Sequence, residues 1–200
     1  VEGAWFAAAR TYGALVVLAV GLCLLTGWAS RRSMRLLFLS SAFVLVGYVM
    51  IRAATGPDGA SSLFVGEPGQ VALAIPGGNP EMTAALALTL VWPLLWLAAD
   101  PAERSPLRGL ALAAVFGLVA LAVLAQSSAA WLCIAATAVL ALAFFPGRLR
   151  MLACALLPAL LMVWAFPGLN DYALKGPGAV GVRPLEFILL VGMAVTGFSG

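Results

Sequence analysis

Three basic residues lie in the two longest segments between apolar stretches, and their chemistry suits a phosphate. Arg52 follows one apolar stretch, and Lys175 and Arg183 lie in a later segment rich in glycine and proline. If these segments meet at one membrane surface, the three cations could bind a lipid-linked phosphate, because arginine binds phosphate oxygens bidentately. The alternative is that Arg52 and Arg183 are interfacial anchors that extend toward lipid headgroups.

Other groups that carry chemistry are scarce. The chain has no histidine, the commonest general base and metal ligand, and it has no GxxxxGK[ST], HExxH or GxSxG motif. Cys23, Cys133 and Cys154 lack CxxC spacing and lie in apolar stretches, so we interpret them as small apolar fillers. We therefore predict no catalytic residue, metal or cofactor within these 200 residues.

A second polar cluster is formed by Gln126, Ser127 and Ser128, between two apolar stretches. Serine at a helix start satisfies free backbone amides. We interpret the three residues as turn and capping residues.

Long apolar stretches dominate the chain. Hydrophobic residues make up 64% and charged residues 10%, a balance outside that of soluble domains. Stretches of roughly 16 to 19 residues suit a bilayer core of about 30 Å, where each backbone amide must bond within its own helix. We predict an all-α, polytopic transmembrane helix bundle of about seven spans, with the seventh starting near Leu185 and the others at Tyr12–Trp28, Leu36–Ile51, Met82–Ala99, Leu107–Ala125, Ala129–Phe145 and Leu149–Phe166.

The arginines predict the orientation, because cytoplasmic loops carry an excess of basic residues. Every second loop is basic, which places the N-terminus outside. The net charge of +3 then reflects membrane orientation and calls for no nucleic-acid partner. The predicted inner residues are Arg31, Arg32, Arg35, Arg104, Arg108, Arg148 and Arg150.

Two predicted outer loops, residues 52–81 and 167–184, interrupt a single transmembrane domain of residues 1–200. The first contains the apolar pieces Ser61–Val65 and Val71–Ile75, which fit either a re-entrant segment or a hairpin. It ends in Asn79, Pro80 and Glu81, a signal for a helix start, since asparagine caps and proline suits the first helical position. Because the chain begins at Val1 and stops at Gly200 inside an apolar stretch, we expect an excerpt of a longer protein.

Two of these turns resemble one membrane-protein family. The segment from Pro76 to Ala85 resembles the G-Y-P-N-A-N-A-A segment that opens a span in O-antigen ligase and polymerase-like proteins. The segment from Leu124 to Leu132 resembles their Q-S-R-G-A-W-L turn, with Ser128 and Ala129 in place of arginine and glycine. The helix and the turns that lie between and after these two segments also match the family, at Trp92–Ala98, Arg108 and Pro146–Arg150. The resemblance therefore covers most of residues 70–175.

The resemblance implies a fold of about a dozen helices in the bacterial cytoplasmic membrane. It implies a glycosyltransferase that transfers or polymerises glycans from a polyprenyl diphosphate carrier at the outer membrane face, in polysaccharide biosynthesis of the cell envelope. The family's catalytic histidine and arginine lie in a large outer loop, which we expect downstream. Two other functions fit the residues: a lipid or small-molecule exporter or flippase, and a non-catalytic membrane subunit.

Overall fold

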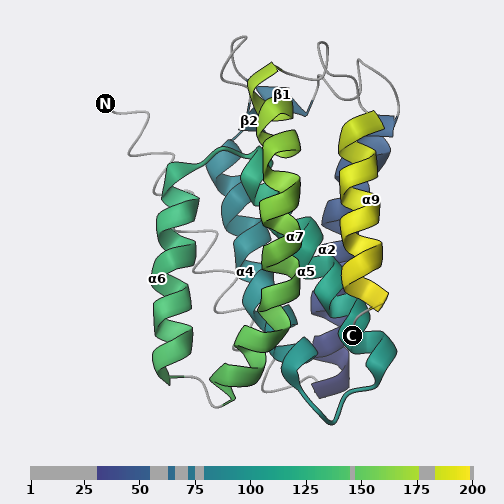
Figure 1. Cartoon of the computed structure of the whole chain (residues 1–200), viewed down its shortest axis with the longest axis vertical. Coiled ribbons are helices and arrows are strands. Elements are labelled where there is room, and N and C mark those ends of the chain that lie inside the picture. Colours follow the sequence, from purple (N-terminus) through teal and green to yellow (C-terminus); the bar gives the residue numbers. More distant parts are fainter. Residues whose placement is uncertain are drawn as a thin grey trace. The chain divides into compact units, whose positions relative to one another are not determined.

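The computed structural model describes residues 31–54, 63–65, 72–74, 79–144, 147–175 and 183–198. The chain divides into two compact units, Val1–Phe38 and Leu39–Gly200. The predicted span Tyr12–Trp28 lies outside the described residues. In the second unit, the described chain is an all-α helical bundle with one small β hairpin (Figure 1).

Six helices are described, and four of them are long and apolar enough to cross a membrane. These four are α2, α4, α5 and α7. The helices α6 and α9 are apolar but shorter, with 17 and 16 residues. The four candidate spans support a membrane protein, and the number of seven spans stays a prediction. The helix bounds are α2 Arg31–Ala54, α4 Pro80–Ala99, α5 Ser105–Leu124, α6 Ser128–Phe144, α7 Arg148–Lys175 and α9 Arg183–Phe198.

The predicted start of α4 is confirmed. Pro80 occupies the first turn, and the Asn79 side chain accepts a hydrogen bond from the Glu81 amide at 2.8 Å. This bond satisfies one of the amides that a helix start leaves without an internal partner. Local sequence alone therefore determines where α4 begins.

The helix α5 forms the centre of the second unit. Apart from Val119, every residue from Ala111 to Ala125 is buried, and α5 contacts α4, α7 and α9. Small residues allow this close approach. A Cβ on Gly117 would lie 3.0 Å from Val46 Cγ2 of α2, so the two helices are already in contact there.

The contact between α5 and α9 depends on glycine. A Cβ built on Gly192 of α9 would overlap the Phe116 ring of α5, and one on Gly109 would overlap the Gly197 carbonyl. Nearby, the buried Thr196 hydroxyl donates to the Gly192 carbonyl at 2.8 Å, so this polar group is satisfied within its own helix. Any side chain at Gly192 must push the two helices apart.

The segment between α2 and α4 contains a β hairpin, one of the two alternatives that we predicted. Strands β1 (Phe64–Val65) and β2 (Ala72–Leu73) pair antiparallel, with Phe64 opposite Leu73. The Ala74 amide extends the pairing by donating to the Leu63 carbonyl at 2.8 Å. Since α2 continues to Ala54 and α4 begins at Pro80, the predicted loop 52–81 is shorter at both ends.

The predicted loop 167–184 requires a larger correction. The helix α7 continues through Pro167 to Lys175, and α9 begins at Arg183. Proline removes one backbone hydrogen bond, which a helix tolerates where packing holds it. Here that packing comes from a buried face beyond the proline, formed by Leu169, Tyr172 and Ala173.

We expect Gly192→Ala to lower the free energy of unfolding by about 1–3 kcal/mol, because the added methyl group overlaps the Phe116 ring. Thermal unfolding of the purified protein in detergent measures the effect. Gly47→Ala is the matched control, since no atom lies within 4 Å of a Cβ there and alanine favours the helix. Equal midpoints for both variants would contradict the close α5–α9 contact.

Candidate functional site

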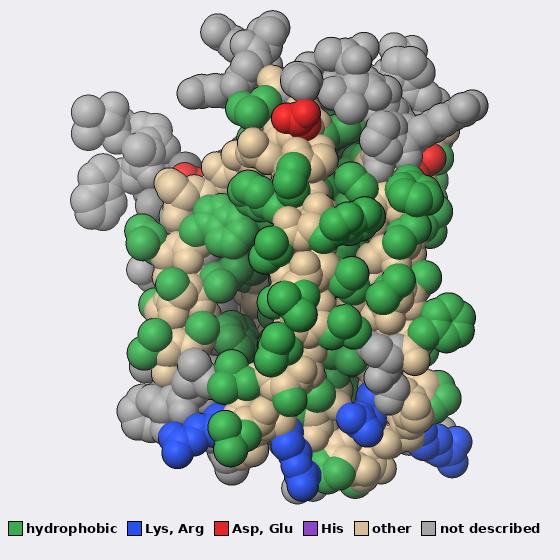
Figure 2. All heavy atoms as spheres, in the orientation of Figure 1, with side chains coloured by type: hydrophobic (Ala, Val, Ile, Leu, Met, Phe, Trp, Pro, Cys, Tyr) green, Lys and Arg blue, Asp and Glu red, His purple; other side chains and the backbone are tan. Residues whose placement is uncertain are grey.

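The helices of the second unit have two chemically different ends. We call the end that carries the β1–β2 hairpin the hairpin end; the last turns of α2 and α7 and the first turns of α4 and α9 lie there (Figure 1). The opposite end carries the turns before α5 and α7, and we call it the arginine end. Basic side chains gather there and apolar ones cover the middle of the face shown in Figure 2. The arginine end holds Arg104, Arg108, Arg148 and Arg150.

The three predicted phosphate-binding residues all belong to helix turns at the hairpin end. Arg52 lies in the last turn of α2, Lys175 is the last residue of α7, and Arg183 is the first of α9. The Arg52 side chain is half-buried, and its positive charge is favourable beside the negative end of the α2 dipole. The side chains of Lys175 and Arg183 lie outside the described residues, so a common binding site for these cations stays a prediction.

A buried tyrosine at the hairpin end is the functional candidate that the sequence analysis missed. Tyr172 of α7 is 1% exposed, and its ring packs against Phe64 of β1 with 5.4 Å between the centroids. Its hydroxyl is buried and has no hydrogen-bond partner among the described residues. A buried hydroxyl without a partner is costly, so such a group in a folded protein calls for an explanation, for example a bound ligand.

Acidic residues accompany Tyr172 at this end. Glu186 in the first turn of α9 is close enough to act electrostatically on Tyr172, and Asp171 precedes the tyrosine on α7. The sequence did contain a signal: Ala165, Leu169 and Tyr172 recur at helical spacing, and all three are buried. The proline at position 167 outweighed this signal in our prediction.

The polar cluster on the turn between α5 and α6 has the predicted turn geometry. Gln126 has a positive φ of 48°, and its side-chain amide donates to the Val123 carbonyl at 3.0 Å. The Ser127 carbonyl accepts the Trp131 amide at 3.4 Å in the first turn of α6. These bonds hold the turn together and agree with a structural role.

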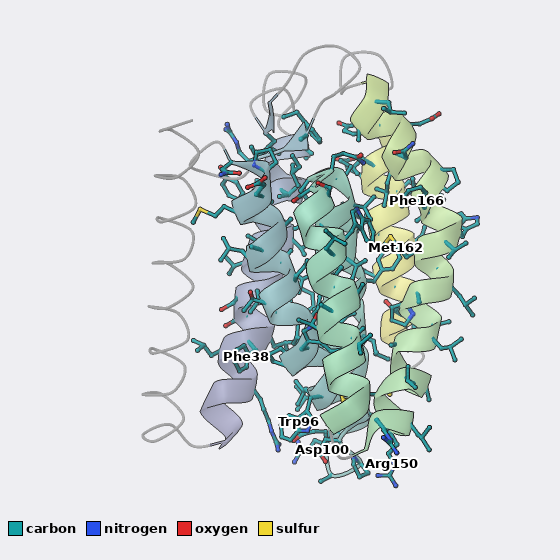
Figure 3. All side chains as sticks on the ribbon, turned by 90° about the vertical axis from the view of Figure 1, so that its left-hand side faces the viewer. Phe38, Trp96, Asp100, Arg150, Met162 and Phe166 are labelled. Carbon is teal, nitrogen blue, oxygen red and sulfur yellow. The ribbon has the colours of Figure 1, made fainter. Side chains whose placement is uncertain are left out.

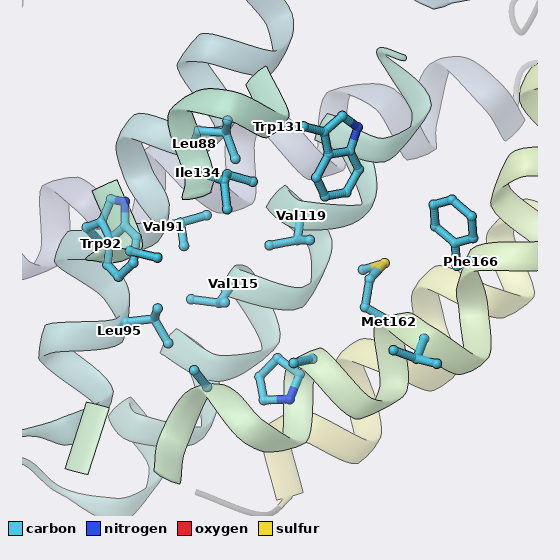
Figure 4. Close-up of a pocket in the computed structure, with 15 residues that line it drawn as sticks. Leu88, Val91, Trp92, Leu95, Val115, Val119, Trp131, Ile134, Met162 and Phe166 are labelled. Carbon is cyan, nitrogen blue, oxygen red and sulfur yellow. The ribbon is translucent and has the colours of Figure 1, made fainter. Parts of the chain in front are cut away.

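An apolar groove lies between four helices on one side of the bundle. Its volume is about 650 Å³, which is the size of a small-molecule site (Figure 4). The Trp92 indole donates to the Thr137 hydroxyl at 3.1 Å and so links α4 to α6 along the groove. The lining residues are Leu88, Val91, Trp92 and Leu95 of α4, Val115 and Val119 of α5, Trp131, Ile134 and Ala138 of α6, and Ala155, Pro158, Ala159, Met162, Val163 and Phe166 of α7.

No metal-binding cluster is present among the described residues, where no three histidine, cysteine, aspartate or glutamate side chains come together. The Cys154 thiol is free and donates to the Ala98 carbonyl, with the sulfur 3.7 Å from the oxygen. This contact fits a cysteine that packs between α7 and α4.

The fold is an all-α helical bundle with four helices that are long and apolar enough to cross a membrane. Comparison of the chain with protein families, with curated proteins and with solved structures gave no match. Its function must therefore be inferred from the chemistry of its own residues.

We expect Tyr172→Phe to raise the free energy of unfolding by about 1 kcal/mol, because it removes a buried hydroxyl that has no described partner. Tyr172→Ala, which also removes the packing against Phe64, should cost about 3–5 kcal/mol. Tyr48→Phe is the control, since Tyr48 is 37% exposed. Thermal unfolding in detergent distinguishes the variants, and a destabilised Tyr172→Phe would mean that the hydroxyl has a partner.

Proposed function

We propose that this chain is part of an integral membrane protein of the bacterial cytoplasmic membrane that transfers glycans from a polyprenyl diphosphate carrier. The hairpin end is then the outer face, with the N-terminus outside. The arginine-rich turns favour this orientation, because basic residues accumulate on the cytoplasmic side. The two turns that resemble O-antigen ligases and polymerases supply the class of reaction.

One observation carries the proposal most directly. The last turns of α2 and α7 and the first turn of α9 lie at the same end of the bundle, and each contains one of the three cations Arg52, Lys175 and Arg183. A diphosphate carries enough negative charge to engage several cations at once. In this proposal, the cations hold the diphosphate, which leaves with its polyprenyl chain when the bond from the anomeric carbon to the diphosphate breaks and an acceptor hydroxyl forms the new bond to that carbon.

The buried hydroxyl of Tyr172 supports the same location. It lies one turn before the end of α7, at the same end as the three cations, and has no described partner. Glu186 and Asp171 add acceptors for sugar hydroxyls near the proposed diphosphate.

The test is glycan transfer by the full-length protein with an undecaprenyl-linked donor. We expect Arg52→Ala combined with Arg183→Ala to lower kcat/KM by about 100-fold, at roughly tenfold for each lost charge-assisted contact to phosphate. Arg104→Ala combined with Arg148→Ala, at the opposite end, is the matched control and should leave turnover unchanged. Unchanged turnover in the Arg52 and Arg183 double variant would refute the proposed binding site.

A second function, export or flipping of a lipid or small apolar molecule, is favoured by the groove between α4, α5, α6 and α7. The lining of the groove contains no charged residue, which suits apolar cargo. Proteoliposomes separate the two functions: movement of a labelled lipid without a covalent product supports the exporter, and a glycosylated product supports the transferase.

A further inference from the structure

We propose that the arginine end binds one anionic phospholipid, with its phosphate at Arg150 and one acyl chain in the apolar groove. This site is at the opposite end of the helices from the proposed glycan site and does not depend on it. The apolar groove would hold the acyl chain, and a polar hollow with an arginine, on the same helices, would hold the phosphate.

The groove lies at the depth where a bilayer supplies hydrocarbon. Its lining comes from the middle of α4, α5 and α7, three of the four candidate spans. The face between α6 and α7 is hollowed and carries mainly apolar side chains (Figure 2). The outer side of α7 beside it exposes large apolar residues, with Leu156 57% and Leu160 60% exposed. A hydrocarbon chain is therefore the molecule that a membrane would present to this opening.

A second hollow of about 200 Å³ lies at the arginine end, and its lining includes residues of α4 and α7, as that of the groove does. It is lined by Trp96, Asp100 and Arg150, among others, and Figure 3 shows these three side chains near one another. Trp96 follows the groove residue Leu95 on α4. On α7, the hollow residue Met151 lies about one helical turn, 5.4 Å, before the groove residue Ala155. A lipid can thus place its headgroup in the hollow and its chain in the groove.

The arginines at and beside the hollow favour an anionic headgroup. Arg150 is exposed, and Arg148 lies two residues before it, at the start of α7. Basic pockets between transmembrane helices on the cytoplasmic side bind anionic lipid headgroups. Arg108, by contrast, donates to the Ala98 carbonyl at 3.0 Å and so caps the end of α4. Arg150 is therefore the residue that we assign to the phosphate.

Asp100 lines the same hollow and opposes an anion. One of its carboxylate oxygens accepts the Ala102 amide at 3.0 Å, which orients the group toward its own turn. Asparagine keeps that acceptor oxygen and removes the charge. We therefore expect Asp100→Asn to strengthen binding of the anionic lipid about fivefold.

Native mass spectrometry of the purified chain, with added phosphatidylglycerol or phosphatidylcholine of the same acyl chains, tests the proposal. We expect preferential binding of phosphatidylglycerol. Arg150→Gln should weaken that binding about fivefold, the usual contribution of one arginine near an anionic lipid surface. Arg104→Gln is the matched control at the same end and should change it less than twofold.

The groove is tested separately from the charge. Ala155→Phe fills the groove next to the hollow and should weaken retention of both lipids, whereas Ala153→Phe, on the exposed face of α7, should not. Equal binding of the two lipids, or equal effects of Arg150→Gln and Arg104→Gln, would overturn the proposal. Unchanged retention of lipid by Ala155→Phe would also overturn the proposal. A dimer of the chain that Ala155→Phe dissociates would overturn it too, since a second copy of the chain would then occupy the groove.

Discussion

Close packing of small residues around α5 is the interaction on which the rest of the bundle depends. Lipid chains are as apolar as leucine, so burying apolar surface gives little net drive for helices to associate inside a membrane. Van der Waals contact between helices must supply the driving force for association, and such contact requires their backbones to approach closely. Gly117 against Val46 and Gly192 against Phe116 provide this approach to α2 and α9. These contacts hold α2 and α9 against the central helix α5.

The bundle separates its chemistry between its two ends. The hairpin end combines a half-buried Arg52 with a buried Tyr172 and the acidic Glu186, whereas the arginine end carries four arginines around short turns. The helices between them are apolar, so no charge lies near the middle of the candidate spans. Within the described residues, charged groups can therefore be recognised at the two ends, and apolar molecules can be held along the side of the bundle, in the groove.

The sequence predicted a local feature well wherever the residues that produce it all lie in one short segment. The Asn79 cap and the Pro80 start of α4 needed only neighbouring residues, and so did the turn at Gln126. The hairpin near Phe64 was one of two alternatives, because a run of three to five apolar residues fits a strand or a re-entrant piece equally well. The error at Pro167 has the opposite origin: proline and glycine favour a loop locally, whereas burial of Leu169 and packing of Tyr172 against Phe64 of β1 keep α7 continuous.

The sequence by itself predicted apolar helices long enough to cross a membrane, because length and hydropathy are set residue by residue, and the structure contains four such helices. It did not determine which helix is central. The candidate spans α5 and α7 have similar mean hydropathy. In the apolar stretch of 18 residues that could cross a membrane, however, 78% of α5 is buried and only 22% of α7. Hydropathy cannot separate a face that meets protein from one that meets lipid, since both environments are apolar. Only the tertiary structure, through the shape of the contacts at glycine and alanine, placed α5 inside, opened the groove beside α7 and buried Tyr172.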